Sequence, residues 1–137
     1  MKKWIWIVSI ALAAAAIIFL TDVKGTAVNH VLRNEEALSA FAETYLECPE
    51  ESTQYGSWKV DCGNTDGVVQ FRVRYIGFGS QSDEWGFYYS PENRYVALGN
   101  GPESVPLRSG VQFSGEGDNY TYVEKITDHW YWYEIHW

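Results

Sequence analysis

The chain has 137 residues, which is enough for one domain and too few for two well-packed ones. All 18 acidic residues but only 8 of the 10 basic ones lie after residue 20, so residues 21–137 carry a net charge of 8 − 18 = −10. Such a domain repels nucleic acid and anionic lipid headgroups, which argues against both as partners. Aromatic residues make up 17% of the chain, a content that excludes a disordered protein.

The N-terminus predicts a membrane anchor or signal segment over residues 1–20. Lys2 and Lys3 precede seventeen uncharged, mostly apolar residues, 4–20. This length is at the lower limit for a membrane-spanning helix. The two lysines favour a cytoplasmic N-terminus and a C-terminal domain outside the cytoplasm.

Cleavage of this segment is the alternative to a retained anchor. The best cleavage site has small residues at Gly25 and Ala27, but the charged Asp22 and Lys24 come just before it. This arrangement favours retention. The sequence therefore predicts a single-pass protein of the cell membrane that contacts the membrane through residues 4–20, with a linker over residues 21–27.

Residues 28–137 are predicted to form one extracytoplasmic domain that begins with a helix. Apolar residues between Val28 and Leu46 recur at helical spacing, and Pro49 prevents the helix from continuing. In an alternative reading, Asn34 caps a helix that starts at Glu35, and the residues before it form a separate turn.

After Pro49 the apolar period changes to two, which predicts strands separated by short turns. Connections this short cannot hold crossover helices, so neighbouring strands are expected to pair antiparallel. The predicted fold class is α+β: an N-terminal transmembrane segment, then one helix packed on an antiparallel meander of about six strands. The predicted strands are Tyr55–Val60, Val68–Tyr75, Trp85–Ser90, Arg94–Leu98, Tyr120–Ile126 and Trp130–Trp137.

The last predicted strand is aromatic on both faces. Trp130, Trp132, Glu134 and His136 share one side, and Tyr131, Tyr133, Ile135 and Trp137 share the other. Because Glu134 and His136 resist burial without partners, the first side is expected to be the wetter one. Trp130, Trp132 and Glu134 are therefore the predicted binding residues, with both Trp rings at least partly exposed. If both sides were buried, the strand would be central and the proposal of a binding surface on it would lose its main support.

The two cysteines, Cys48 and Cys62, predict one disulfide in an oxidising compartment. A pair of free thiols is the alternative. No metal site and no cofactor is predicted, because the histidines and cysteines lack the spacing of metal ligands.

Two runs of residues resemble a group of small membrane-anchored proteins of Gram-positive bacteria. The first run extends from Trp85 to Asn93, with Val96–Leu98 after it, and the second comprises Tyr122–Ile126 and Trp130–Glu134. The layout is also similar: a basic start, one hydrophobic segment, one helix and then strands. This resemblance implies no activity.

The predicted function is that of a membrane-anchored extracytoplasmic binding or interaction module, contacting an envelope protein or glycan. One alternative is a hydrolase acting on envelope material, with Asp83, Glu84 and Glu134 as candidate paired carboxylates. Another is an acidic immunity-type protein that covers a basic toxin. A concave pocket with two carboxylates would favour the enzyme, and a flat exposed aromatic row would favour binding.

Overall fold

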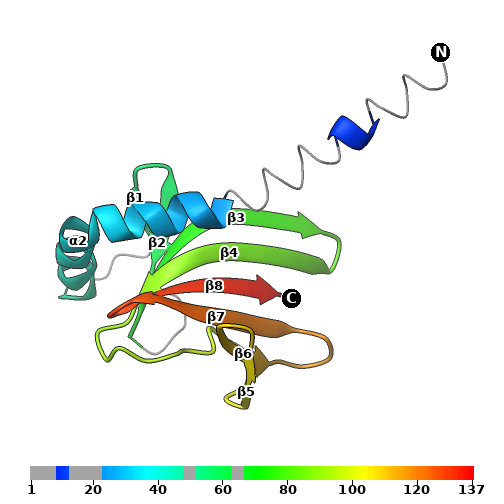
Figure 1. Cartoon of the computed structure of the whole chain (residues 1–137). Helices are drawn as coiled ribbons and strands as arrows, with labels where there is room; N and C mark the ends of the chain where they lie inside the picture. The colour runs from blue at the N-terminus through cyan, green and yellow to red at the C-terminus, as the bar shows by residue number, and fades with distance from the viewer. Residues whose placement is uncertain (1–8, 13–22, 48–51, 63–66) are drawn as a thin grey trace.

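A computed structural model describes residues 9–12, 23–47, 52–62 and 67–137 (Figure 1). Three helical segments, 9–12, 23–33 and α2 (Glu35–Glu47), precede a sheet of eight antiparallel strands among the described residues. The strands are β1 (Thr53–Tyr55), β2 (Trp58–Asp61), β3 (Val69–Phe78), β4 (Gln81–Tyr89), β5 (Ser104–Leu107), β6 (Gly110–Ser114), β7 (Tyr120–Thr127) and β8 (Trp130–His136).

The sheet consists of two four-stranded meanders joined side by side. Its order is β1-β2-β3-β4-β8-β7-β6-β5, so the last strand of each meander, β4 and β8, pair in the middle. Segment 90–103 connects the two meanders. As a result the C-terminal strand is a central strand, with β4 on one side and β7 on the other.

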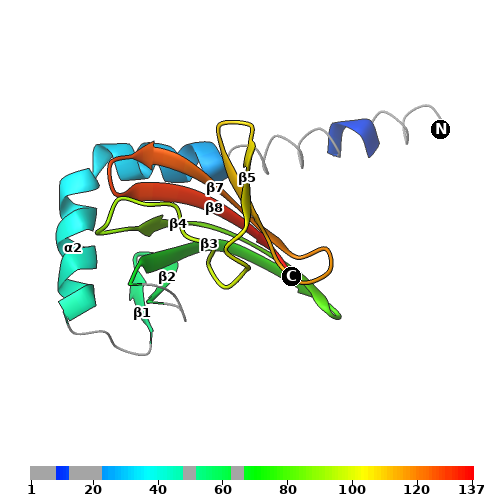
Figure 2. The ribbon, with the colours of Figure 1, turned by 90° about the horizontal axis from the view of Figure 1, so that it is seen from below.

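The sheet is covered on both faces, by the helices on one and by segment 90–103 on the other (Figures 1 and 2). On the helix face, Trp130 and Trp132 of β8 pack into a cluster with Leu38 and Ala42 of α2. On the opposite face, the other aromatic row of β8 packs under Val96. The alternating apolar pattern of β8 is therefore buried on both sides, as expected for a central strand.

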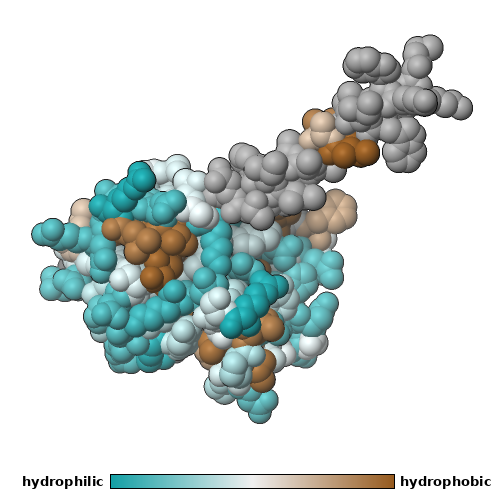
Figure 3. Space-filling view, in the orientation of Figure 1, coloured by the Kyte–Doolittle hydropathy of each residue, from teal (hydrophilic) through white to brown (hydrophobic). Residues whose placement is uncertain are grey.

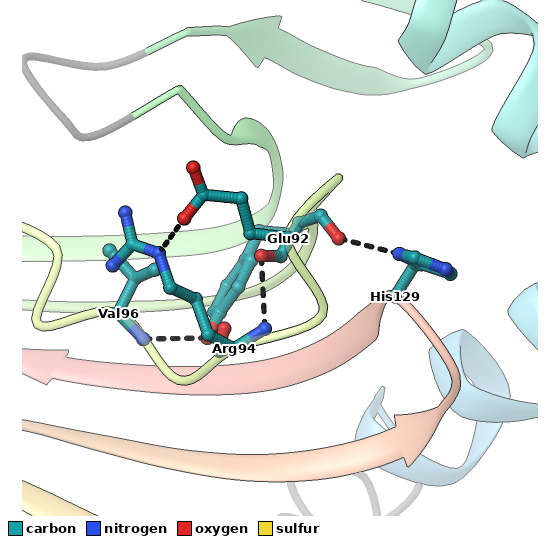
Figure 4. Close-up of polar contacts among 6 residues, drawn as sticks. Glu92, Arg94, Val96 and His129 are labelled. Atoms are coloured by element: carbon teal, nitrogen blue, oxygen red, sulfur yellow. Dashed lines mark hydrogen bonds and ion pairs between the residues drawn. The ribbon is translucent and has the colours of Figure 1, made fainter.

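Hydrogen bonds of residues 90–96 hold the start of segment 90–103 in place against the sheet (Figure 4). The Tyr88 hydroxyl accepts a bond from the amide of Val96 (3.0 Å), and the Ser90 hydroxyl accepts one from the amide of Arg94 (3.2 Å). The Ser90 carbonyl lies 2.9 Å from the Nδ1 atom of His129. Residues 90–96 thus form a turn that holds the covering segment against the sheet.

The predicted fold class is wrong. The sheet has eight strands instead of about six, and the described residues form three helical segments, 9–12, 23–33 and α2, instead of one helix. None of these described helices is long and apolar enough to cross a membrane. Of the predicted anchor, residues 4–20, only 9–12 are among the described residues.

The difference in strand number has local causes. Gly56, with a φ of 61°, turns the chain inside the predicted strand Tyr55–Val60 and makes it the β1–β2 hairpin. A further hairpin, β5–β6, forms in a region rich in turn residues, where the sequence offered no clear period. The predicted strand Arg94–Leu98 belongs instead to the covering segment. The amide of Val96 bonds to the Tyr88 hydroxyl of β4, and the amide of Arg94 bonds to the Ser90 hydroxyl within the segment itself.

The predicted helix Val28–Leu46 is divided at Asn34. The Asn34 amide and side-chain Nδ2 both donate to the carbonyl of His30, at 3.0 and 2.9 Å, which ends the first segment. The Asn34 carbonyl accepts from the amide of Leu38 and starts α2, whose first turn contains Glu35 and Glu36. The alternative reading was right about this start, but the residues before it form a helix and not a turn. The chain turns sharply between the two segments (Figure 2).

Candidate functional site

A cavity of about 370 Å³ opens on the helix face of the sheet, beside residues 23 and 24 of helical segment 23–33. It is built from these two residues, strands β3, β4 and β8, and the β5–β6 turn. On the side seen in Figure 3, hydrophilic residues dominate the surface and apolar ones form separate patches. The cavity is lined by Val23, Lys24, Arg74, Trp85, Arg108, Trp132 and Glu134.

A β-bulge in β3 directs Arg74 into this cavity. The pairing of β3 with β4 shifts between Arg72, which lies opposite Gly86, and Arg74, which lies opposite Trp85. An extra residue in one strand reverses the side to which the following side chains point. The two arginines, which strict alternation would place on one face, therefore point to opposite faces. Arg72 forms an ion pair with Glu84 on the face away from the helices (2.8 Å).

Strand β8 supplies the floor of the cavity. The indole Nε1 of Trp132 donates to the Oε1 atom of Glu134 (3.1 Å), which fixes the carboxylate at the cavity wall. Glu134 is half-buried, and a carboxylate can accept more hydrogen bonds than this one.

The predicted exposure of the Trp rings is wrong. Trp130 is fully buried and Trp132 is 1% exposed. The reason is the central place of β8, which packs against helices on this side. Of the predicted binding residues, Trp132 and Glu134 line the cavity and Trp130 does not. Trp85, Arg74, Arg108 and Lys24 were not predicted.

A chain of charged and phenolic groups orders one wall of the cavity. The Lys24 ammonium lies 2.8 Å from the Glu124 carboxylate, which also accepts from the hydroxyl of Tyr122 at 2.8 Å. The Arg108 guanidinium stacks over the Tyr122 ring, 5.5 Å from its centroid. Partial burial would raise the pKa of Glu124, but the bonds from Lys24 and Tyr122, with the charges of Lys24 and Arg108, outweigh it and lower that pKa.

Positive charge is therefore concentrated at the cavity. Lys24, Arg74 and Arg108 are three of the eight basic residues in a region whose net charge is −10. These three basic side chains come from three separate elements and meet at the cavity. The lining thus contains three basic residues and one acidic residue, Glu134.

The carboxylates named as a possible hydrolytic set are divided between the two faces. Asp83 lies on the helix face, where its Oδ1 atom is 2.6 Å from the Nδ1 atom of His136, whose ring stacks on Tyr120 at 5.5 Å. Glu84 is buried on the opposite face and accepts from the hydroxyl of Tyr133 (2.7 Å). Adjacent residues of a strand point to opposite sides, so Asp83 and Glu84 cannot act on one substrate.

The predicted Cys48–Cys62 disulfide stays a prediction. Cys48 lies outside the described residues, and no disulfide is found within the part of the chain that is described. Cys62 follows β2 and packs against the core. As a thiol it would react slowly, because burial and the nearby Asp61 carboxylate raise its pKa.

Comparison with known proteins gives no relatives: no family model, no curated protein and no solved structure matches the chain. Among residues 9–12, 23–47, 52–62 and 67–137, no three metal-binding side chains gather closely enough to hold an ion. The cavity is therefore assessed from its own geometry.

We expect most tyrosines of the folded protein to ionise at a higher pH than tyrosines of the unfolded chain. The chain has ten, and burial raises the pKa of Tyr88, Tyr89, Tyr120, Tyr122, Tyr131 and Tyr133. For Tyr89 and Tyr122 the pKa rises to about 12, because burial is reinforced by hydrogen bonds to Glu43 and Glu124. A phenol whose pKa is raised by folding stabilises the fold below its unfolded pKa, and that stability is lost as pH rises.

The measurement is an absorbance titration of phenolate in native and denatured protein. Near pH 11, fewer than half of the phenols should be ionised in the native state and most in the denatured state. The free energy of unfolding should fall as the pH rises from about 10 to about 12. Coincident native and denatured curves would contradict the burial of the aromatic rows.

Proposed function

We propose that this protein is a non-catalytic binding module that holds a small ligand in the cavity on the helix face. The observation that carries the proposal is the convergence of three basic side chains, two tryptophans and one carboxylate on that cavity. Its volume of about 370 Å³ is at the low end of the range for small-molecule sites, roughly 300–1,000 Å³. A few convergent polar groups around aromatic rings are typical of such sites.

The binding surface that we propose here is concave, whereas the sequence predicted a flat and exposed one. An exposed row of Trp rings would have suited a flat protein partner or glycan surface. With Trp130 and Trp132 buried, the aromatic lining consists of the half-buried Trp85 and of Trp132, which is 1% exposed. A concave site supports a small ligand, or one end of a larger molecule, better than a flat partner.

A hydrolase is supported less well by the same geometry. Its acid would need a carboxyl group that stays protonated near neutral pH. The lowered pKa of Glu124 keeps that group ionised, and Glu84 lies on the other face of the sheet. Residues 4–20, with Lys2 and Lys3 before them, are the basis for proposing that the module works outside the cytoplasm.

The test is a ligand-observed NMR screen of the full-length chain in mild nonionic detergent. The panel contains small sugars, sugar acids, amino acids, carboxylic acids and nucleotides. Val23→Phe would fill the cavity from the helix side. Leu32→Phe is the matched control, because Leu32 belongs to the same helical segment and is 50% exposed.

We expect compounds that bind the natural chain to bind the Leu32→Phe variant equally and the Val23→Phe variant weakly or not at all. Circular dichroism melts of both variants confirm that they remain folded. The proposal is wrong if no compound of the panel binds, or if every binder is indifferent to Val23→Phe.

A further inference from the structure

Exposed apolar side chains gather where β3 turns into β4, at residues 75–82, which we call the β3–β4 tip. The tip extends past the last residue of β8 (Figures 1 and 2). Phe78 is 92% exposed, more than any other large apolar side chain of the described residues, and Tyr75 and Ile76 are 57% and 43% exposed. No residue of the tip is charged. Apolar side chains that are exposed together mark a surface that contacts something other than water.

We infer that the β3–β4 tip is a second contact with the membrane, at which Phe78 and Ile76 enter the interface between the lipid headgroups and the acyl chains. The inference rests on the proposed anchoring through residues 4–20 and is independent of the ligand in the cavity. Aromatic and aliphatic side chains without neighbouring charges are the ones that such an interface accommodates.

The chain after the proposed anchor lies close to the tip. Val23 lines the cavity together with Arg74 of β3. Phe78 is four residues further along β3, which corresponds to about 13 Å at the usual rise of a strand. In both views the blue end of segment 23–33 lies toward the same side of the molecule as the tip (Figures 1 and 2). An anchor that precedes this segment would therefore hold the tip near the bilayer.

The tip is apolar on both faces of the sheet, which favours lipid over a flat protein partner. Ile76 pairs with Asp83 on the helix face, and Phe78, two residues later, shares that face. Tyr75 pairs with Glu84 and points to the opposite face. A flat partner would cover one face and leave the other in water, whereas a bilayer interface surrounds an inserted turn on both sides.

The magnitudes suit a contact that supplements an anchor. Burial of one Phe side chain favours the inserted state by roughly ten- to a hundredfold. This is too little to hold a free protein at a membrane, but it suffices for a turn that a tether keeps at high local concentration. The acidic domain repels anionic headgroups, but salt at physiological strength screens charges that lie more than about 8 Å away. The part that would touch lipid is uncharged.

The test is ¹⁹F NMR of the full-length chain in phosphatidylcholine nanodiscs, with fluorophenylalanine at its six phenylalanines. Phe78→Leu and Phe19→Leu identify two resonances, of which Phe78 reports on the tip and Phe19 on the proposed anchor. A spin-labelled phosphatidylcholine broadens the resonances of nuclei near lipid. A water-soluble gadolinium chelate broadens those of nuclei exposed to water.

We expect the spin-labelled lipid to broaden the resonances of both Phe78 and Phe19. The gadolinium chelate should broaden Phe78 at least about threefold less than the additional ring of Val105→Phe, because an inserted ring is shielded from water. Val105 is the matched position, since it is 56% exposed and lies on the edge strand β5, far from β3 in the sheet.

Ile76→Asp places a charge in the tip and should reduce the lipid broadening of Phe78 at least about threefold, because a carboxylate resists leaving water. Val105→Asp makes the same change on β5 and should leave the Phe78 resonance unaltered. Thermal melts report whether each variant remains folded. The measurement on the natural chain decides the inference even if Ile76→Asp fails to fold.

The possible failures are distinguishable. Lipid broadening of Phe19 without that of Phe78 overturns this inference and leaves the proposed anchoring intact. If neither resonance is broadened by lipid, the anchoring proposal fails as well. A Phe78 resonance that is shielded from both reagents overturns the lipid contact in favour of a protein contact, such as a second copy of the chain. The ligand screen with Val23→Phe decides the proposed function separately.

Discussion

Replacing Trp130 with alanine is expected to lower the free energy of unfolding by about 3–5 kcal/mol, close to the whole stability of many small domains. Trp130 is fully buried and packs against the rings of Phe71, Phe87 and Tyr89. Its indole Nε1 also donates to the hydroxyl of Ser39 in α2, at 3.1 Å. The substitution therefore leaves a cavity and removes one of the hydrogen bonds between α2 and the sheet.

The matched control is Trp137→Ala. Trp137 follows β8 directly and is 36% exposed, so the same change should cost roughly 1 kcal/mol or less. Urea denaturation followed by circular dichroism gives both values. Equal losses for the two variants would show that the packing around Trp130 is not what stabilises the centre of the sheet.

Gly86→Ala is expected to destabilise the protein by about 3 kcal/mol or more. Gly86 lies in β4 opposite Tyr133 of β8. A Cβ atom there would overlap the carbonyl oxygen of Phe71 and come within 2.7 Å of the Tyr133 hydroxyl. Neither neighbour can yield easily: the carbonyl is backbone of the paired strand, and the hydroxyl is bonded to buried Glu84.

Gly25→Ala serves as the control for this substitution. Gly25 lies in the first helical segment, and a Cβ atom there would meet no atom within 4 Å. Because alanine favours helix over glycine, the control should be neutral or stabilised by up to about 1 kcal/mol. Thermal melts of both variants give the comparison, and an undiminished melting temperature for Gly86→Ala would contradict the close strand packing.

Much of the sheet could be predicted from local sequence. The alternation in Val69–Tyr75 and the aromatic runs of the last two strands identify β3, β7 and β8, because each is long enough to show a period of two. Strands of three to five residues, such as β1 and β5, are too short to show one. Their existence depends on partners that local patterns do not reveal.

The site was less predictable than the fold, and Arg74 shows why. Simple alternation places it on the same side as Arg72, and only the bulge moves it to the cavity. A bulge depends on the partner strand, so no residue type marks it reliably in the sequence. Likewise, Lys24 and Arg108 are far from β8 in sequence, and their convergence follows from a strand order that places β8 beside β4.

The central position of the C-terminal strand has a consequence for how the protein is made. During synthesis β4 emerges long before β8, so its pairing edge has no partner until β8 has been made. An open, apolar strand edge is prone to associate with other chains. Folding of the sheet should therefore wait for synthesis of β8 and be slow for its size, because the decisive pairing joins distant segments. A chain that stops before β8 would lack the strand that joins its two halves and would be a substrate for proteolysis.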